Sequence, residues 1–232
     1  YAELEQYDHA IYDYDKAIEL DSSNAMPYSN RGNCYGELKQ IERAIQDYDK
    51  AIELDSNYAV AYYNRGNRYS DWKQYERAIQ DYDKAIELDP SYAAAYYNRG
   101  NCYDILEQYE LAIQDYDKAI ELDPNDATAY NNRGCSYAAL ENHEQAIQDY
   151  TKAMELGANK AIVYGNRGES YYKLDKHDLT IANCSRCIEL DPNHSEAYKY
   201  RALAYRAIGE TALAEADEAK AAELEAAQKG NV

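Results

Sequence analysis

Small and apolar residues recur three and four positions apart along almost the whole chain, with polar and acidic residues between them. In AIQDYDKAIELD, which begins at Ala44, this spacing gathers the apolar side chains on one face of a helix. No run of alternating β-branched residues competes with the helical spacing. The pattern therefore predicts an all-α protein.

The same stretch returns at a fixed period of 34 residues, at Ala78 and Ala112, with variants at Ala10 and Ala146. From Ala44 onward, a second helical stretch that carries the letters NRG precedes each copy. Its glycines are Gly32, Gly66, Gly100, Gly134 and Gly168. Two helices in each period, closed by prolines such as Pro90, predict a solenoid of stacked helical hairpins.

Each period also contains tyrosines and small residues at fixed places, followed by a closing position. In the third period these are Tyr62, Gly66, Tyr69, Ala78, Tyr82, Ala85 and Pro90. This set resembles the consensus of the tetratricopeptide repeat (TPR) family. The resemblance implies a right-handed superhelical solenoid of antiparallel helix pairs that binds a protein or peptide.

The period divides the chain into a single predicted solenoid over residues 1–224, followed by a C-terminal tail over 225–232. The first segment, 1–24, is the back part of a repeat, and the last, 195–224, is a divergent capping repeat. The full repeats are 25–58, 59–92, 93–126, 127–160 and 161–194.

Glycine inside a helix costs about 0.5–1 kcal/mol relative to alanine, so its periodic return needs a compensating gain. We interpret that gain as close approach of the second helix, which offers small residues such as Ala44 and Ala78. Tyrosines fill the space beside this contact.

A different face of the first helix is rich in amides, and the TPR resemblance places this face along a concave groove. The amides are Asn30, Asn33, Asn64, Asn67, Asn98, Asn101, Asn132 and Asn166. They resemble the asparagine-ladder type of TPR groove, in which amides hold the main chain of an extended peptide. An amide offers one acceptor and two N–H donors, which suits that task. The alternative is that these asparagines only solvate the helix surface.

The remaining groove positions suggest which ligand would fit. Tyr63 and Tyr97 are predicted to pack on ligand side chains. Charged residues are few at the groove positions, although they make up 29% of the chain. Asp71 and Asp104 are the acids of the central groove, and they favour a neutral or basic ligand.

TPR domains that bind carboxylate tails use lysine or arginine in a three-repeat pattern with asparagine. The matching positions here are Ser29 and Asn33, then Asn64, then Ala94 and Asn98. Because the cations are missing, we do not expect a carboxylate clamp.

The arginine of NRG has a predicted structural role. The arginines are Arg31, Arg65, Arg99, Arg133, Arg167 and Arg201, and the second helices offer Asp47, Asp81, Asp115, Asp149, Asn183 and Asp217 in the same order. A guanidinium held between helices needs a carboxylate or carbonyl partner, so we predict that these residues pair.

Cysteines and histidines are interpreted as packing residues. Cys184 and Cys187 occupy core positions and lack a second ligand pair at zinc spacing, while His143 and His177 stand where earlier repeats carry tyrosine. Unpaired cysteines indicate a reducing compartment. No catalytic motif is present, so the sequence predicts no enzyme, cofactor or metal site.

The formal net charge of −19 excludes nucleic acid as an expected partner, because binding it needs clustered lysine and arginine. No apolar run is long enough to cross a bilayer, so we expect no membrane partner and a cytoplasmic location. The expected partner is an extended, neutral to basic protein segment. The alternative function is a structural scaffold that self-associates weakly through the ends of the repeat stack.

Overall fold

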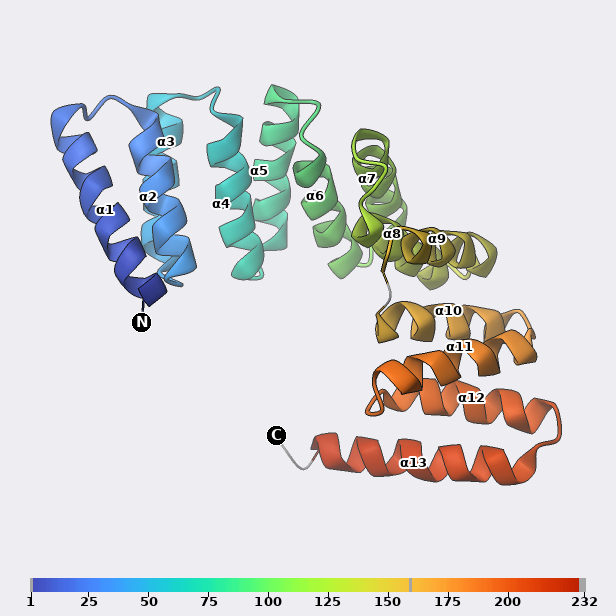
Figure 1. The fold of residues 1–232 in the computed structure, drawn as a ribbon. Helices are drawn as coiled ribbons and strands as arrows, with labels where there is room; N and C mark the ends of the chain where they lie inside the picture. The colour runs from blue at the N-terminus through green and yellow to red at the C-terminus, as the bar shows by residue number, and fades with distance from the viewer. Residues whose placement is uncertain (1, 159, 230–232) are drawn as a thin grey trace. The chain divides into compact units, whose positions relative to one another are not determined.

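The computed structural model describes residues 2–158 and 160–229, which contain thirteen helices and no strand (Figure 1). After α1 (Ala2–Leu20) come α2 (Ala25–Glu37), α3 (Ile41–Leu54), α4 (Ala59–Asp71), α5 (Tyr75–Leu88), α6 (Ala93–Ile105), α7 (Tyr109–Leu122), α8 (Ala127–Ala139), α9 (His143–Glu155), α10 (Ala161–Lys173), α11 (His177–Leu190), α12 (Ser195–Ala207) and α13 (Thr211–Lys229). The all-α prediction of paired helices is confirmed.

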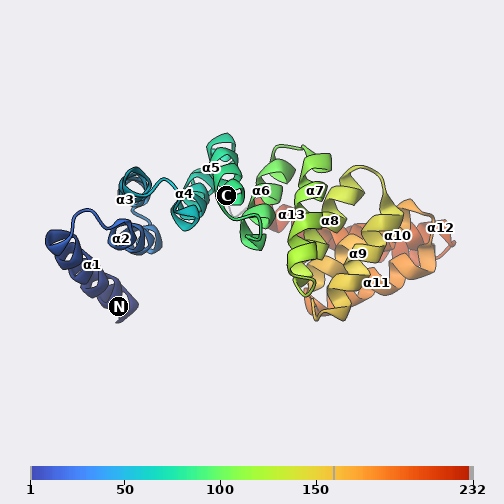
Figure 2. The same cartoon turned by 90° about the horizontal axis from the view of Figure 1, so that it is seen from above.

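The helices form two compact units, residues 1–122 and 123–232. In the first unit α2 packs on α3, α4 on α5 and α6 on α7, and α3–α4 and α5–α6 contacts join the hairpins. Figure 2 shows these hairpins following one another in chain order. The second unit repeats the arrangement with α8 to α13. One solenoid over 1–224 stays a prediction, and α13 makes residues 225–229 of the predicted tail helical.

Each hairpin turns through a residue in left-handed conformation. At the end of α4, Lys73 has φ 58°, its N–H donates to the Ser70 carbonyl at 2.8 Å, and the N–H of Gln74 donates to the Tyr69 carbonyl at 2.8 Å. These bonds satisfy carbonyls at the helix end. The equivalent residues are Lys39, Glu107, Glu141, Asp175 and Gly209, all with positive φ.

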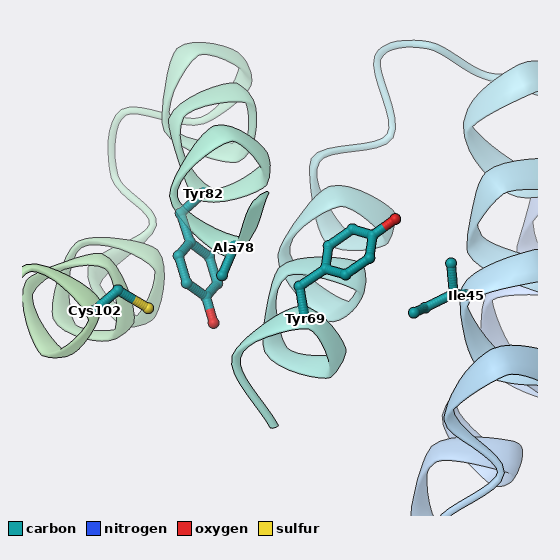
Figure 3. Packing of buried hydrophobic residues seen from close by; sticks show 5 residues of the cluster. All are labelled: Ile45, Tyr69, Ala78, Tyr82 and Cys102. Carbon is teal, nitrogen blue, oxygen red and sulfur yellow. The ribbon is translucent and has the colours of Figure 1, made fainter. Parts of the chain in front are cut away.

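The core lies between the hairpins. One cluster joins Ile45 of α3, Tyr69 of α4, Ala78 and Tyr82 of α5, and Cys102 of α6 (Figure 3). Tyr82 is 1% exposed, and it reaches this depth only because α4 and α6 cover it from both sides. Each repeat therefore completes the core of its neighbours, as expected for a solenoid.

The periodic glycines lie close to the second helix, as expected, and the nearest side chains are tyrosine rings at Gly32, Gly66, Gly100 and Gly134 and the Cys184 thiol at Gly168. A Cβ on Gly66 would lie 2.8 Å from Cε1 of Tyr82 and 3.3 Å from the backbone oxygen of Ala78. Such a distance leaves no room for a methyl group. In the last repeat Glu218 replaces the tyrosine, and the glycine position is Ala202. The glycine therefore leaves room for the facing side chain of the second helix, which is a tyrosine ring in four repeats and the Cys184 thiol in the fifth.

Candidate functional site: the amide face of the first helices

The predicted amides lie on the first helix of each hairpin. In the first unit they occur in pairs on α2, α4 and α6, and in the second unit Asn132 lies on α8 and Asn166 on α10. Asn33 is exposed and the other seven are half-buried. The eight ladder residues therefore all retain some exposure, and their role in holding a ligand stays a prediction.

The structure shows that these amides also bond to one another across repeats. Nδ2 of Asn64 donates to Oδ1 of Asn33 at 2.9 Å, and the Tyr48 hydroxyl donates to the same oxygen at 2.7 Å. One repeat later, Nδ2 of Asn98 donates to Oδ1 of Asn67 at 2.9 Å. The ladder thus braces neighbouring hairpins, a role that neither sequence interpretation included.

This bracing limits what each amide can offer to a ligand. Asn64 uses one N–H, which leaves its carbonyl oxygen and a second N–H. Nδ2 of Asn98 also lies 3.1 Å from the Tyr63 hydroxyl, so both of its N–H groups are engaged and its carbonyl oxygen is left. The carbonyl oxygens of Asn33 and Asn67 are already engaged by two donors each, so the row presents N–H donors on Asn33 and Asn67 and carbonyl acceptors on Asn64 and Asn98.

The two predicted groove tyrosines pack partly on the scaffold. Tyr63 is half-buried, with its ring centroid 4.7 Å from that of Tyr92 and 6.0 Å from that of Tyr82. The Tyr97 ring lies 5.9 Å from that of Tyr116. Each tyrosine therefore has a fixed orientation, which would lower the entropy cost of packing on a ligand.

A cation that the sequence interpretation missed lies beside Asp71. Nη1 of Arg68 is 3.3 Å from Oδ2 of Asp71, and both residues line a cavity of about 220 Å³ together with Ser70 and Asn98. A Cβ on Gly36 would lie 2.8 Å from Nη1 of Arg68, so this glycine makes room for the arginine. The equivalent residues in other repeats are small: Cys34, Cys102, Ser136, Ser170 and Ala204.

Arg68 offsets the charge of Asp71, which weakens the argument that Asp71 attracts a basic ligand. Asp104, the other predicted acid, is half-buried on α6. The signal for Arg68 was present in the sequence, since it is the single large residue at a position that is otherwise small.

The second unit replaces parts of the amide network. Nδ2 of Asn166 donates to Sγ of Cys135 at 3.3 Å, and the Tyr150 hydroxyl lies 3.6 Å from the same sulfur. One repeat later, the Tyr200 hydroxyl donates to Oε1 of Glu169. The geometry is conserved between repeats, while the acceptor changes from amide to thiol to carboxylate.

The NRG arginines pair as predicted and also contact the preceding repeat. Nε and Nη2 of Arg65 donate to Asp81 at 2.8 and 2.6 Å, and Nη1 donates to Asp49 at 2.6 Å. Burial lowers the pKa of Arg65, but the two carboxylates outweigh it and raise that pKa above its ordinary value. Arg65 therefore holds three helices together and is not available to a ligand.

The other arginines repeat this bridge with changing partners. In the first unit Arg31 bonds to Asp47 and Asp15, and Arg99 to Asp115 and Asp83. In the second unit the pairs are Arg133 with Asp149, Arg167 with Asn183 and Thr151, and Arg201 with Asp217 and Ser185.

Buried thiols and histidines take packing positions. Cys34, Cys102, Cys184 and Cys187 are buried, and burial raises the pKa of Cys187 to about 11. A thiol with that pKa is a poor nucleophile. His143 is 6% exposed. Among residues 2–158 and 160–229, no three histidine, cysteine or acidic side chains are placed to bind a metal ion.

None of the described helices combines the length and apolar character that crossing a membrane requires.

These features define an all-α repeat protein whose first helices expose an ordered polar face. Two family models described as "Tetratricopeptide repeat" match residues 25–58, 93–126, 127–159 and 161–194, and residues 47–80 and 183–216, and a model described as "TPR repeat" matches 1–39 and 66–104. The chain belongs to the tetratricopeptide repeat family. Repeats of this family are generally non-enzymatic protein-interaction modules, and the family supports a protein-interaction scaffold for this chain.

Solved structures agree. YrrB, described as "a TPR protein with an unusual peptide-binding site", is 30% identical with a TM-score of 0.72, over 79% of this chain and 95% of YrrB. MamA is 31% identical with a TM-score of 0.62, over 65% of this chain and 88% of MamA. A TPR protein from Cytophaga hutchinsonii, 22% identical over 94% and 90% of the two chains, shares the fold with a TM-score of 0.76. No curated protein matches the chain.

Proposed function

We propose that the chain binds an extended segment of another protein along the amide face of its first helices. The observation that carries this proposal is the hydrogen-bonded row of Asn33, Asn64, Asn67 and Asn98, which fixes a line of amide donors and acceptors on an accessible face. An extended main chain carries an N–H donor and a C=O acceptor at nearly every residue, so such a row can bind it whatever its sequence.

Cross-repeat bracing makes the row a better receptor than free amides would be. A side chain that is already held by its neighbour loses little rotamer freedom when a ligand arrives. A neutral hydrogen bond contributes about 0.5–1.5 kcal/mol net, so affinity comes from several rungs together. Tyr63, Tyr97, Asp71 and Asp104 then provide selectivity, and the net charge of −19 favours a neutral to basic segment.

The relatives support the same reading. YrrB, the 30% identical structure, is described as having a peptide-binding site, which makes peptide binding a reasonable function for this chain as well.

The test begins with peptides selected from a random display library on the intact protein. In the triple variant Asn64→Ala, Asn98→Ala, Asn132→Ala, we expect affinity for those peptides to fall by about a hundredfold or more, since 1.4 kcal/mol is tenfold. Fluorescence anisotropy measures the affinity, and circular dichroism checks helicity.

The matched control is Tyr82→Phe, which removes the hydroxyl that donates to Asn67 at 2.8 Å but keeps every amide. It should weaken the scaffold slightly and leave binding within about threefold of the parent. A folded triple variant that binds as tightly as the parent would show that the ligand does not bind this face. If sedimentation also showed mass growing with concentration, the self-associating scaffold would replace the proposal.

A further inference from the structure

A second cavity lies at the repeat-equivalent place in the second unit. It has a volume of about 260 Å³ between α8, α9 and α10, and its lining includes Ala138, Ala139, Glu141, Glu169 and Lys173. Cavities for drug-sized ligands measure roughly 300–1,000 Å³, so this one suits a single side chain.

The two cavities differ in the side chains of the wall that a ligand would contact. The positions of Ser70 and Asp71 in the first unit are Ala138 and Ala139 in the second. Two methyl groups therefore replace a hydroxyl and a carboxylate on the wall, which leaves an apolar surface and more room. The carboxylates come instead from Glu141 and Glu169.

Glu169 is held in place by its neighbour. Its Oε1 accepts the hydroxyl of Tyr200, and burial together with the Glu169 carboxylate raises the pKa of Tyr200, so that hydroxyl stays a donor. Glu141 also lines the cavity, and its Oε2 lies 3.4 Å from Nε2 of His143. These two carboxylates outnumber the one ammonium group in the lining, that of Lys173.

We propose that this cavity is a selectivity pocket for an arginine or lysine side chain of a segment bound along the amide face of α8 and α10, an inference that rests on the proposed function. The methylene stem packs on Ala138 and Ala139, and the cationic head lies between Glu141 and Glu169. Lys173 is exposed, so its ammonium group can move into water when the cation arrives. An acidic side chain would meet two carboxylates of its own sign.

The probes are N-acetyl-arginine-N-methylamide and its citrulline counterpart, which has nearly the same shape without the charge. Titration of the intact protein is followed by the NMR signals of the Ala138 and Ala139 methyl groups. We expect the arginine probe to shift both signals and to bind at least about threefold more tightly than the citrulline probe.

Glu169→Gln keeps an acceptor for Tyr200 and removes the charge, so it should bring the two affinities within about 1.5-fold. The matched control is Glu107→Gln, an exposed glutamate of the first unit at the repeat position of Glu141, which should leave the preference for arginine unchanged. Circular dichroism and the Tyr200 ring signals show whether the Gln variant keeps its packing.

Equal affinity of the two probes would overturn the proposal. Tighter binding of N-acetyl-glutamate-N-methylamide would overturn it as well, because the cavity would then bind an acidic side chain through Lys173. Selected peptides that still lose affinity in the asparagine triple variant would then leave the proposed function intact. Unchanged affinity of the selected peptides for the folded asparagine triple variant, with the arginine preference of the probes retained, would overturn the proposed function alone.

Discussion

The arginine bridge makes each hairpin sensitive to the loss of one charged side chain. Arg65 is 18% exposed and Asp81 7%, so removal of either partner leaves a charge largely out of water. We expect Arg65→Ala to lower the free energy of unfolding by about 3–5 kcal/mol. Urea unfolding of both single variants and the double variant measures the coupling, and a cycle without coupling would assign Arg65 to another role.

The second unit contains an arginine–asparagine bridge that can be compared with the Arg65–Asp81 bridge. Nε of Arg167 donates to Oδ1 of Asn183 at 2.9 Å, in the place of the Arg65–Asp81 bond. Asp81→Asn should therefore keep one hydrogen bond and destabilise the protein less than Asp81→Ala does.

Residue spacing predicted the Arg65–Asp81 pair but not the contact with Asp49. Asp81 follows Arg65 by 16 residues and Asp49 precedes it by 16, so the second partner was visible as a symmetric spacing. The bonds from Asn64 to Asn33 were not predictable in this way. They depend on side-chain rotamers, which no periodicity in the sequence specifies.

At the scale of the hairpin, each element depends on its immediate neighbours. Deleting residues 59–92 removes α4 and α5 and joins Tyr58 to Ala93. A tyrosine then still precedes α6, as Tyr92 does in the intact chain. Arg99 would then face Asp49 as Arg65 does. We expect a folded, less stable protein with unchanged helicity per residue, since stability is roughly a sum over repeats and interfaces.

Deleting residues 59–74 is the control, because it removes α4 and leaves α5 without its partner. This variant should lose cooperative unfolding in circular dichroism. Equal behaviour of the two deletions would contradict the repeat as the unit of folding.

Helix boundaries followed from the sequence because proline and the period mark them, as at α5, which ends at Leu88 shortly before Pro90. The left-handed residue inside each hairpin did not follow from the sequence. Lysine disfavours φ 58°, so local propensity gives no reason to place Lys73 there, and the packing of α4 on α5 imposes it.

The whole molecule relies on tyrosine for its core, with 28 tyrosines and no phenylalanine. Burial raises the pKa of Tyr48, Tyr82 and Tyr150, and it raises that of Tyr92 to about 12. A raised folded-state pKa gives stability that is complete below the unfolded value of about 10 and is lost as the pH rises above it.

We therefore expect the urea concentration at half-unfolding to decrease as the pH is raised from about 9 to about 11. At about pH 11, each fully buried tyrosine lowers the free energy of unfolding by about 1.4 kcal/mol. Tyr48, Tyr82 and Tyr150 together therefore lower it by about 4 kcal/mol. Phenolate absorbance should show a class of tyrosines that ionises only on unfolding. Changing Tyr48, Tyr82 and Tyr150 to phenylalanine should flatten the pH dependence, and an unchanged slope would show that other groups cause it.

The left-handed turn residues give the protein a margin for evolutionary change. Lys39, Lys73, Glu107 and Asp175 each hold a conformation that costs a side-chain-bearing residue about 1–2 kcal/mol and costs glycine almost nothing. The four turns belong to separate hairpins, so relief at one adds to relief at the next. Glycine at these turns would supply stability in equal steps without altering the amide face. A lineage, or an engineer, that changes the turns first can then accept destabilising substitutions in the groove while it acquires a new partner.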